Sequence, residues 1–272
     1  MKLSIVVSTQ PASFAALAYQ GRLRENLVKV KGLGYDGVEL AVRDPQLLDI
    51  GEIQRWLAES ALPVPAIGTG QAFGEEGLSL THSDPEVRRQ GIERIKSQVR
   101  FAAEWNAAVI IGLIRGKSEP GVTMDQAECR LLDSLRECAG ENRSVRLVIE
   151  PINRYETDLL NTVDSALRFL ERLAADNVGL LLDTFHMNIE EPSILRSIES
   201  ARDRLFHFHV ADSNRWYPGA GHIDFESIID TLDRVGYQDW LSAEILPCPN
   251  PDTAAERALR QMRSFLGEAA RA

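Results

Sequence analysis

Four short apolar runs in the second half of the chain each end on a side chain that can bind a metal ion. These side chains are Glu150, Asp183, His209 and Glu244. Charged groups at the ends of buried strands are costly unless they coordinate a metal or take part in a reaction. Three carboxylates and one imidazole suit a hard or borderline divalent ion, and we expect Mn²⁺, with Mg²⁺ or Co²⁺ as alternatives. The set therefore predicts a metal-dependent enzyme.

Each of these residues also has an ordinary structural explanation. A carboxylate after a strand often caps the next helix, and a histidine in an apolar strand is usually a hydrogen-bonded core residue. The placement of four such residues on successive predicted strands weakens those explanations. We expect strand alternation to send His207 and His209 to opposite faces, so that His209 alone points inward.

Eight apolar runs alternate with amphipathic stretches along the chain. The predicted strands cover residues 3–8, 37–41, 64–68, 108–113, 147–150, 178–183, 205–210 and 241–246. The predicted helices cover residues 22–33, 51–61, 85–104, 123–140, 163–174, 191–201, 225–235 and 252–268. Strict strand–helix alternation without a low-complexity linker predicts an α/β fold, a single (β/α)8 TIM barrel domain over residues 1–272.

Such a barrel would bring the candidate residues together. Active sites of (β/α)8 barrels lie at the carboxyl ends of the strands, where the four candidate ligands and Glu39 fall. Helix-start signals support the assignment of the elements that hold them. Asp84 precedes Pro85, and Thr123 with Gln126 fits a capping box, while Gly34 follows the first predicted helix.

Composition narrows the classes of partner and location. The net charge of −10 argues against a nucleic-acid partner, because such binding depends on neutralising phosphates. No apolar stretch approaches the roughly 20 residues of a membrane span, so we expect no membrane partner, and the N-terminus lacks the features of a signal peptide. The three cysteines are scattered and predict no disulfide framework. A cytoplasmic protein is the simplest expectation.

Three motifs resemble a known family of sugar enzymes. They are EPINRYE at 150–156, DTFHMNIEE at 183–191 and HFHVADSNR at 207–215. They look like the ketose 3-epimerases, xylose isomerase-like TIM barrels that include D-tagatose and D-psicose 3-epimerases. Three further stretches resemble the branch that converts 5-keto-L-gluconate to D-tagaturonate, namely AIGTGQA at 66–72, LSLTH at 78–82 and IIGLIRG at 110–116.

The resemblance implies a role for each matching residue. It assigns metal binding to the four residues above, and proton transfer to Glu150 and Glu244. The residues it assigns to the substrate are Glu156, His186, Arg215 and Gln71. Arg115, at the fourth predicted strand end, departs from the neutral-sugar enzymes, and an arginine there would suit bidentate binding of a substrate carboxylate. Arg43 is a second candidate, although arginines near barrel loops also pair with loop acids.

The implied reaction is inversion of the carbon next to a ketone. A metal ion polarises the ketone, an enediolate forms, and two carboxylates exchange protons on opposite faces. The predicted enzyme is an isomerase, a carbohydrate epimerase that acts on an unphosphorylated keto-sugar or keto-uronate and is compatible with a homo-oligomer. A neutral ketose 3-epimerase and an aldose–ketose isomerase stay as alternatives. Other classes are a metal-dependent nuclease like the AP endonucleases, which would need a basic groove, and a non-catalytic sugar-binding protein.

Overall fold

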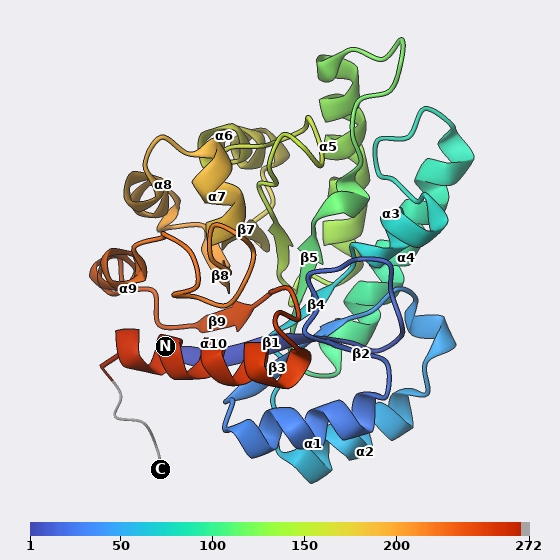
Figure 1. Cartoon of the computed structure of the whole chain (residues 1–272). Coiled ribbons are helices and arrows are strands. Elements are labelled where there is room, and N and C mark those ends of the chain that lie inside the picture. Colours follow the sequence, from blue (N-terminus) through green and yellow to red (C-terminus); the bar gives the residue numbers. More distant parts are fainter. Residues whose placement is uncertain (268–272) are drawn as a thin grey trace.

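A closed ring of parallel strands surrounded by helices forms the protein (Figure 1). The computed structural model describes residues 1–267. The ring consists of β1 (Lys2–Ser8), β3 (Gly37–Ala41), β4 (Ala66–Gly68), β5 (Ala108–Ile111), β6 (Leu147–Ile149), β7 (Val178–Asp183), β8 (Leu205–Val210) and β9 (Trp240–Ala243). Because β1 pairs with both β3 and β9, the sheet closes on itself. The predicted (β/α)8 barrel is confirmed.

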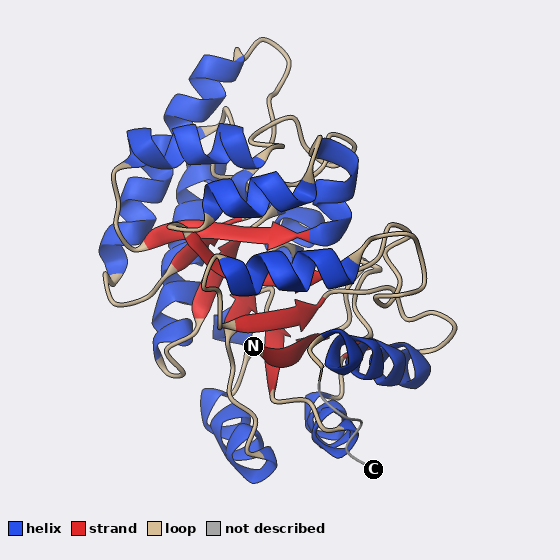
Figure 2. Ribbon diagram, turned by 90° about the vertical axis from the view of Figure 1, so that its left-hand side faces the viewer, coloured by secondary structure: helices blue, strands red, loops and turns tan. Residues whose placement is uncertain are grey.

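Helices follow the strands and lie outside the ring (Figure 2). The eight helices of the repeat are α1 (Leu23–Leu33), α2 (Ile50–Ser60), α4 (Pro85–Ala103), α5 (Met124–Glu141), α6 (Val163–Leu173), α8 (Ile194–Ala201), α9 (Phe225–Arg234) and α10 (Pro251–Phe265). They correspond one to one with the predicted helices. The last residue of the predicted helix 252–268 lies outside the described residues.

The predicted helix boundaries have the expected local chemistry. The Asp84 side chain accepts a hydrogen bond from the backbone amide of Glu86 and caps α4, with Pro85 as the first helical residue. Thr123 and Gln126 form the capping box of α5. Gly34 ends α1 with a φ of 98°, a left-handed conformation that glycine adopts without a Cβ clash.

Several short elements were not predicted. They are the two-residue strand β2 (Tyr19–Gln20), the helices α3 (Gln71–Glu76) and α7 (Thr184–Glu190), and the 3-10 turns η1 (Pro45–Leu47) and η2 (Leu113–Arg115). Segments of two to seven residues are too short to show a period of hydrophobic residues. The predicted strand 108–113 is shorter than expected, because Gly112 and η2 turn the chain away from the sheet directly after Ile111.

The core separates into an outer apolar layer and a more polar barrel interior. Val38 and Leu40 belong to the large apolar cluster, whereas Glu39 between them faces the histidines of β8. Alternation along each strand explains this division. Within residues 1–267, none of the helices has the length and apolar character that a membrane crossing requires. Cys129, Cys138 and Cys248 are free thiols.

Candidate active site

Four side chains from four successive strands of the ring meet at one place. Glu150 and Glu244 directly follow β6 and β9, Asp183 ends β7, and His209 lies in β8. One donor atom from each of the four lies within 4.8 Å of the others. The structure therefore brings together all four residues that the sequence predicted as metal ligands.

Local structure aims these side chains at one another. Asp183 and His209 are direct neighbours in the register of β7 and β8, so their side chains leave the sheet on the same face. The Oδ1 atom of Asp183 accepts a hydrogen bond from the amide of Phe185 at the start of α7, at 2.7 Å. This bond leaves Oδ2 to face His209, whose Nδ1 is 3.9 Å away.

The donor atoms of this set fit a divalent cation. Among the described residues, Glu150 Oε1, Asp183 Oδ2 and His209 Nδ1 are buried and have no hydrogen-bond partner. Unpaired buried donors and acceptors are rare and costly in folded proteins. A cation in their midst would satisfy all three, and oxygen donors with one imidazole suit Mn²⁺, Mg²⁺ or Co²⁺.

The ionisation of the set also reflects its burial. Burial, and then the negative charge of Glu244, hold the pKa of Glu150 well above its ordinary value. Burial likewise raises the pKa of Asp183 and Glu244, against the opposing charge of His209. Burial alone would lower the pKa of His209, but the charge and hydrogen bond of Glu39 raise it to about 10. Without a metal, the site therefore favours the protonated form of its carboxyl groups. A bound cation would instead favour their ionised form.

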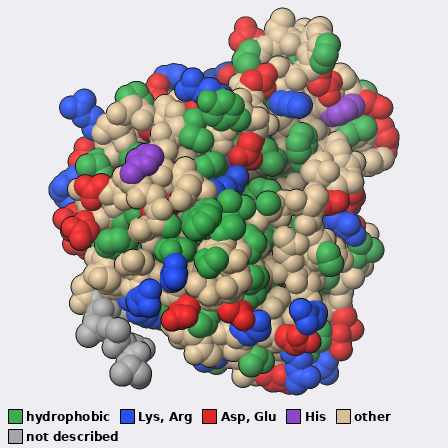
Figure 3. Space-filling view, viewed as in Figure 1, with side chains coloured by type: hydrophobic (Ala, Val, Ile, Leu, Met, Phe, Trp, Pro, Cys, Tyr) green, Lys and Arg blue, Asp and Glu red, His purple; other side chains and the backbone are tan. Residues whose placement is uncertain are grey.

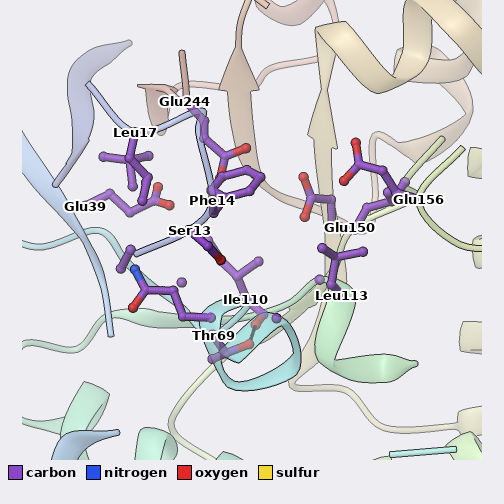
Figure 4. A pocket seen from close by; sticks show the side chains of 18 of the residues that line it. Ser13, Phe14, Leu17, Glu39, Thr69, Ile110, Leu113, Glu150, Glu156 and Glu244 are labelled. Carbon is purple, nitrogen blue, oxygen red and sulfur yellow. Dashed lines mark hydrogen bonds between the residues drawn. The ribbon is translucent and has the colours of Figure 1, made fainter. Parts of the chain in front are cut away.

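A cavity of about 180 Å³ opens beside the four ligands. Figure 4 shows Glu150, Glu156 and Glu244 pointing into it, with Thr69 and Ile110 below them in that view. The rest of its wall is largely apolar and includes Val6, Phe14, Leu17, Leu113 and Ile152, although Glu39 and Glu75 also line it. Figure 3 shows apolar side chains gathered near the middle of the face seen in Figure 1, beside acidic and basic ones. The cavity is smaller than the roughly 300–1,000 Å³ of drug-sized sites and suits a small ligand.

Arg215 lies at the polar side of this cavity and forms ion pairs with two carboxylates. Its guanidinium donates to Glu156 at 3.1 Å and to Glu244 at 3.0 Å. It also lies between two aromatic rings, with Phe14 at 5.0 Å and Phe185 at 4.7 Å from the guanidinium carbon. Its backbone φ of 60° is unusual for a residue with a Cβ, and such strain is common at functional sites.

His186 and Glu156 share an anchor outside the metal set. The side-chain nitrogen of Asn153 (Nδ2) lies 3.0 Å from Glu156 Oε1 and 2.7 Å from His186 Nδ1. The Nε2 atom of His186 faces Glu150 Oε1 at 3.7 Å. Burial, and then the positive charge of Arg215, hold the pKa of His186 well below its ordinary value. His186 is therefore a neutral hydrogen-bonding group at neutral pH.

Gln71 also lines the cavity, at the start of α3. Its amide donates to the Ser8 hydroxyl at 2.7 Å, and its buried carbonyl oxygen has no partner among the described residues. Nothing in the sequence indicated Ser13, Phe14 and Leu17 as site residues. They come from the irregular loop after β1, the dark blue segment in Figure 1, where no periodic pattern exists to read.

The structure contradicts the role predicted for Arg115. This side chain is fully buried and lies outside the cavity lining. Its guanidinium donates to the backbone carbonyls of Leu159 at 3.0 Å, Gly112 at 3.3 Å and Glu150 at 2.5 Å. The η2 turn directs the side chain into the wall of the barrel, so it cannot clamp a substrate carboxylate. Arg43 is also outside the lining and lies 3.6 Å from Glu76.

The orientation predicted for His207 is also wrong. Side chains alternate with a period of two, so residues 207 and 209 share one face of β8. Both rings point into the barrel and both contact Glu39.

Comparison with known proteins places the chain in a family. Residues 27–265 match the model of the xylose isomerase-like TIM barrel. The chain is 34% identical to L-ribulose 3-epimerase of Mesorhizobium japonicum (strain LMG 29417 / CECT 9101 / MAFF 303099), covering 85% of this chain and 78% of that one. It is 28% identical to 3-dehydro-D-guloside 4-epimerase of Escherichia coli (strain K12), covering 88% and 91%.

Solved structures agree with this placement. An L-ribulose 3-epimerase structure superposes with a TM-score of 0.85 at 27% identity, covering 98% of this chain and 94% of that one. The sequence match and the fold point the same way. The chain belongs to the ketose 3-epimerases of the xylose isomerase-like TIM barrel family.

Proposed function

We propose that this epimerase depends on a divalent metal ion and inverts the carbon next to the ketone of an unphosphorylated keto-sugar. The observation that carries the proposal is the set Glu150, Asp183, His209 and Glu244, whose donor atoms lie within 4.8 Å of one another beside the cavity. Three of these donor atoms are buried without a hydrogen-bond partner among the described residues. The names of the relatives support the reaction class.

When bound at this set, the ion would polarise the ketone oxygen and make the neighbouring C–H more acidic. Glu150 and Glu244 carry the protons. They follow β6 and β9, which are separated by two strands in the ring, so they approach a substrate from different directions. One carboxylate takes the proton from one face of the carbon, leaving a planar enediolate. The other, in its protonated form, returns a proton to the opposite face, and the configuration inverts.

The other cavity residues hold the substrate in place. Neutral His186 and the paired Arg215 offer donors beside Glu150 and Glu244. Glu156 and the free carbonyl oxygen of Gln71 offer acceptors for hydroxyl groups. The apolar wall excludes water and keeps the reacting carbon between the two carboxylates.

The charge of the cavity favours a neutral ketose over a keto-uronate. Arg215 is the one lysine or arginine among the described lining residues, and two carboxylates already pair with it. Arg115, the arginine expected to bind the carboxylate of a keto-uronate, is fully buried and donates to backbone carbonyls. The resemblance of residues 66–72, 78–82 and 110–116 to the 5-keto-L-gluconate branch is the remaining support for such a substrate. We therefore put a neutral ketose first and the keto-uronate second. The free cysteines agree with the reducing cytoplasm that we propose as its location.

A substrate panel with controlled metal content tests the proposal. Metal-stripped protein is assayed with and without Mn²⁺, Mg²⁺ or Co²⁺ on L-ribulose, D-psicose, D-tagatose and 5-keto-L-gluconate in deuterated water. We expect turnover with metal only, and one deuterium at the inverted carbon of the product. Full turnover in protein shown by elemental analysis to be metal-free would end the metal proposal. An aldose product would make the enzyme an aldose–ketose isomerase, and a preference for 5-keto-L-gluconate would restore the keto-uronate as the substrate.

A further inference from the structure

A second polar cluster lies inside the barrel next to the metal set. Glu39 of β3 contacts two histidines of β8, with its Oε2 atom 2.8 Å from His207 Nε2. Its two oxygens lie 3.0 and 3.1 Å from His209 Nε2. All three side chains are almost completely buried. The proposed reaction uses neither Glu39 nor His207, so their presence needs another explanation.

These contacts cross the interior of the barrel. The strands β3 and β8 are not neighbours in the ring, since β1 and β9 lie between them on the shorter path. A buried carboxylate is costly unless charged or hydrogen-bonding partners compensate it. Two imidazole groups supply that compensation here, and an apolar residue at position 39 would avoid the cost altogether. The arrangement therefore points to a use for the charge of Glu39.

The geometry of His209 shows what that use is. Its Nε2 atom faces both oxygens of Glu39, which can only accept a hydrogen bond when ionised, so Nε2 carries a proton. Its Nδ1 atom has no partner among the described residues and faces Asp183 Oδ2 at 3.9 Å. One ring nitrogen is thus occupied by Glu39, and the other is directed at the metal set. A metal-binding histidine commonly uses its second nitrogen in this way.

We propose that Glu39 is a positioning residue for metal binding. It holds a proton of His209 on Nε2, which makes Nδ1 the nitrogen that binds a cation, and it fixes the plane of the ring. His207 supplies a second hydrogen bond that holds the Glu39 carboxylate in place. This inference rests on the proposed function, because it requires a cation at Glu150, Asp183, His209 and Glu244.

Metal titration of Glu39→Gln tests the inference. The amide has one acceptor instead of two and no charge, so it cannot serve both histidines as the carboxylate does. Loss of such a partner typically weakens metal affinity roughly 10–100-fold, and we expect a change of that size in the Mn²⁺ Kd measured by calorimetry. At saturating Mn²⁺ the KM for the ketose should stay within about twofold, because both oxygens of Glu39 contact the histidines of β8 although the residue lines the cavity.

His207→Gln is the matched control. A glutamine there still offers a donor to Glu39 and leaves the contact with His209 untouched. We expect a lowered melting temperature in both variants but a nearly wild-type Mn²⁺ Kd in His207→Gln alone. Equal Kd values in the wild type and in Glu39→Gln would overturn the inference. Absence of Mn²⁺ binding in the wild type would instead overturn the proposed function.

A measurement on the wild type covers the case in which Glu39→Gln does not fold. In protein labelled with [15N]histidine and loaded with Mg²⁺, we expect the ring proton of His209 on Nε2 and none on Nδ1. A proton found on Nδ1 would overturn the inference without any variant.

Discussion

The proposed function gives Glu150 and Glu244 two tasks that make opposite demands on the ionisation of these carboxyl groups. A metal ligand must be ionised, whereas a proton carrier must hold a proton during part of the cycle. Burial raises the pKa of both groups, and the charges of His209 and Arg215 oppose this for Glu244. A bound cation would pull in the same direction as those two residues. The proposed function requires that these opposing influences leave each carboxylate able both to bind metal and to accept a proton.

Replacing one carboxylate at a time should separate the proton transfers on the two faces of the reacting carbon. Glu150→Gln and Glu244→Gln are each expected to lose about 10²–10⁴-fold in kcat, measured at saturating Mn²⁺. Each variant keeps one proton carrier. It should therefore still exchange hydrogen with deuterated water in one epimer of the substrate, and the two variants should do so in opposite epimers.

Glu119→Gln is a suitable control for this experiment. Glu119 pairs with His82 at the surface, 3.3 Å away, and lies outside the cavity lining. We expect wild-type turnover and wild-type exchange in this variant. Exchange in the same epimer by both active-site variants would show that one group serves both faces, and would remove the two-carboxylate mechanism.

The elements differ in how far the sequence determined them. Long helices were predictable because capping residues and a helical period act over neighbouring positions, as Asp84 and Thr123 show. The four predicted ligands were recognisable because each ends an apolar run. Glu39 and His207 were not recognised as partners, since 168 positions separate them and only barrel closure brings them together. The loop that supplies Phe14 has no repeating pattern at all.

Arg115 shows the same limit for the η2 turn. Arg115 follows the fourth apolar run, a position that predicts a substrate-binding group. However, Gly112 begins the η2 turn, and the guanidinium of Arg115 donates to the carbonyl oxygen of Gly112. The bonds to Leu159 and Glu150 tie two further segments to this turn. Burial lowers the pKa of Arg115 to about 10, while the charge of Glu150 opposes that change, so the side chain is still a cation at neutral pH. It supports the backbone from which Glu150 projects.

Arg115→Met should therefore reduce stability and leave substrate selection unchanged. The change leaves buried carbonyls without donors, and each such loss costs about 1–3 kcal/mol, so we expect a fall of roughly 3 kcal/mol in the free energy of unfolding. Denaturant titration measures that fall. Arg115→Lys, which keeps a donor and a charge, should recover part of it.

The ratio of kcat/KM for 5-keto-L-gluconate to that for a neutral ketose gives the second readout. We expect the ratio to be equal in wild type and Arg115→Met, because the guanidinium does not reach the cavity. A stable variant that selectively loses activity on the keto-uronate would restore the carboxylate-binding role that the structure contradicts.

If the proposed function holds, the whole barrel surrounds a site whose buried carboxylates are unfavourable without a cation. The four ligands come from β6 to β9, so the metal set joins one half of the ring, while β1 closes the other half against β9 and β3. Three buried carboxylates and one imidazole meet at this junction. When the carboxyl groups of Glu150, Asp183 and Glu244 ionise without a metal, they repel one another. This repulsion destabilises the folded state and not the unfolded chain. The proposed metal binding would therefore be coupled to global stability.

The coupling predicts how stability depends on pH. Carboxyl groups with a raised pKa stabilise the fold in their protonated form, and this stability is lost as pH rises through the raised pKa. His209, with its pKa raised to about 10, changes in the same direction above its unfolded value of 6.5. His186 and His207 have lowered pKa values, so they act only below about pH 6.5. Metal-free protein should thus become less stable between about pH 6.5 and 8.5.

A divalent ion should oppose that loss. At 100 times its Kd, Mn²⁺ should add about 2.7 kcal/mol and raise the melting temperature by roughly 5–10 °C, with the larger shift at the higher pH. Calorimetric melting at both pH values, with chelator or with Mn²⁺, measures the difference. Asp183→Asn is the matched control, because the amide oxygen still accepts from Phe185 but the unpaired Oδ2 is replaced. That variant should melt higher than metal-free wild type at about pH 8.5 and respond little to Mn²⁺. A wild-type melting temperature that Mn²⁺ leaves unchanged at both pH values would separate the fold from the metal site and refute the coupling.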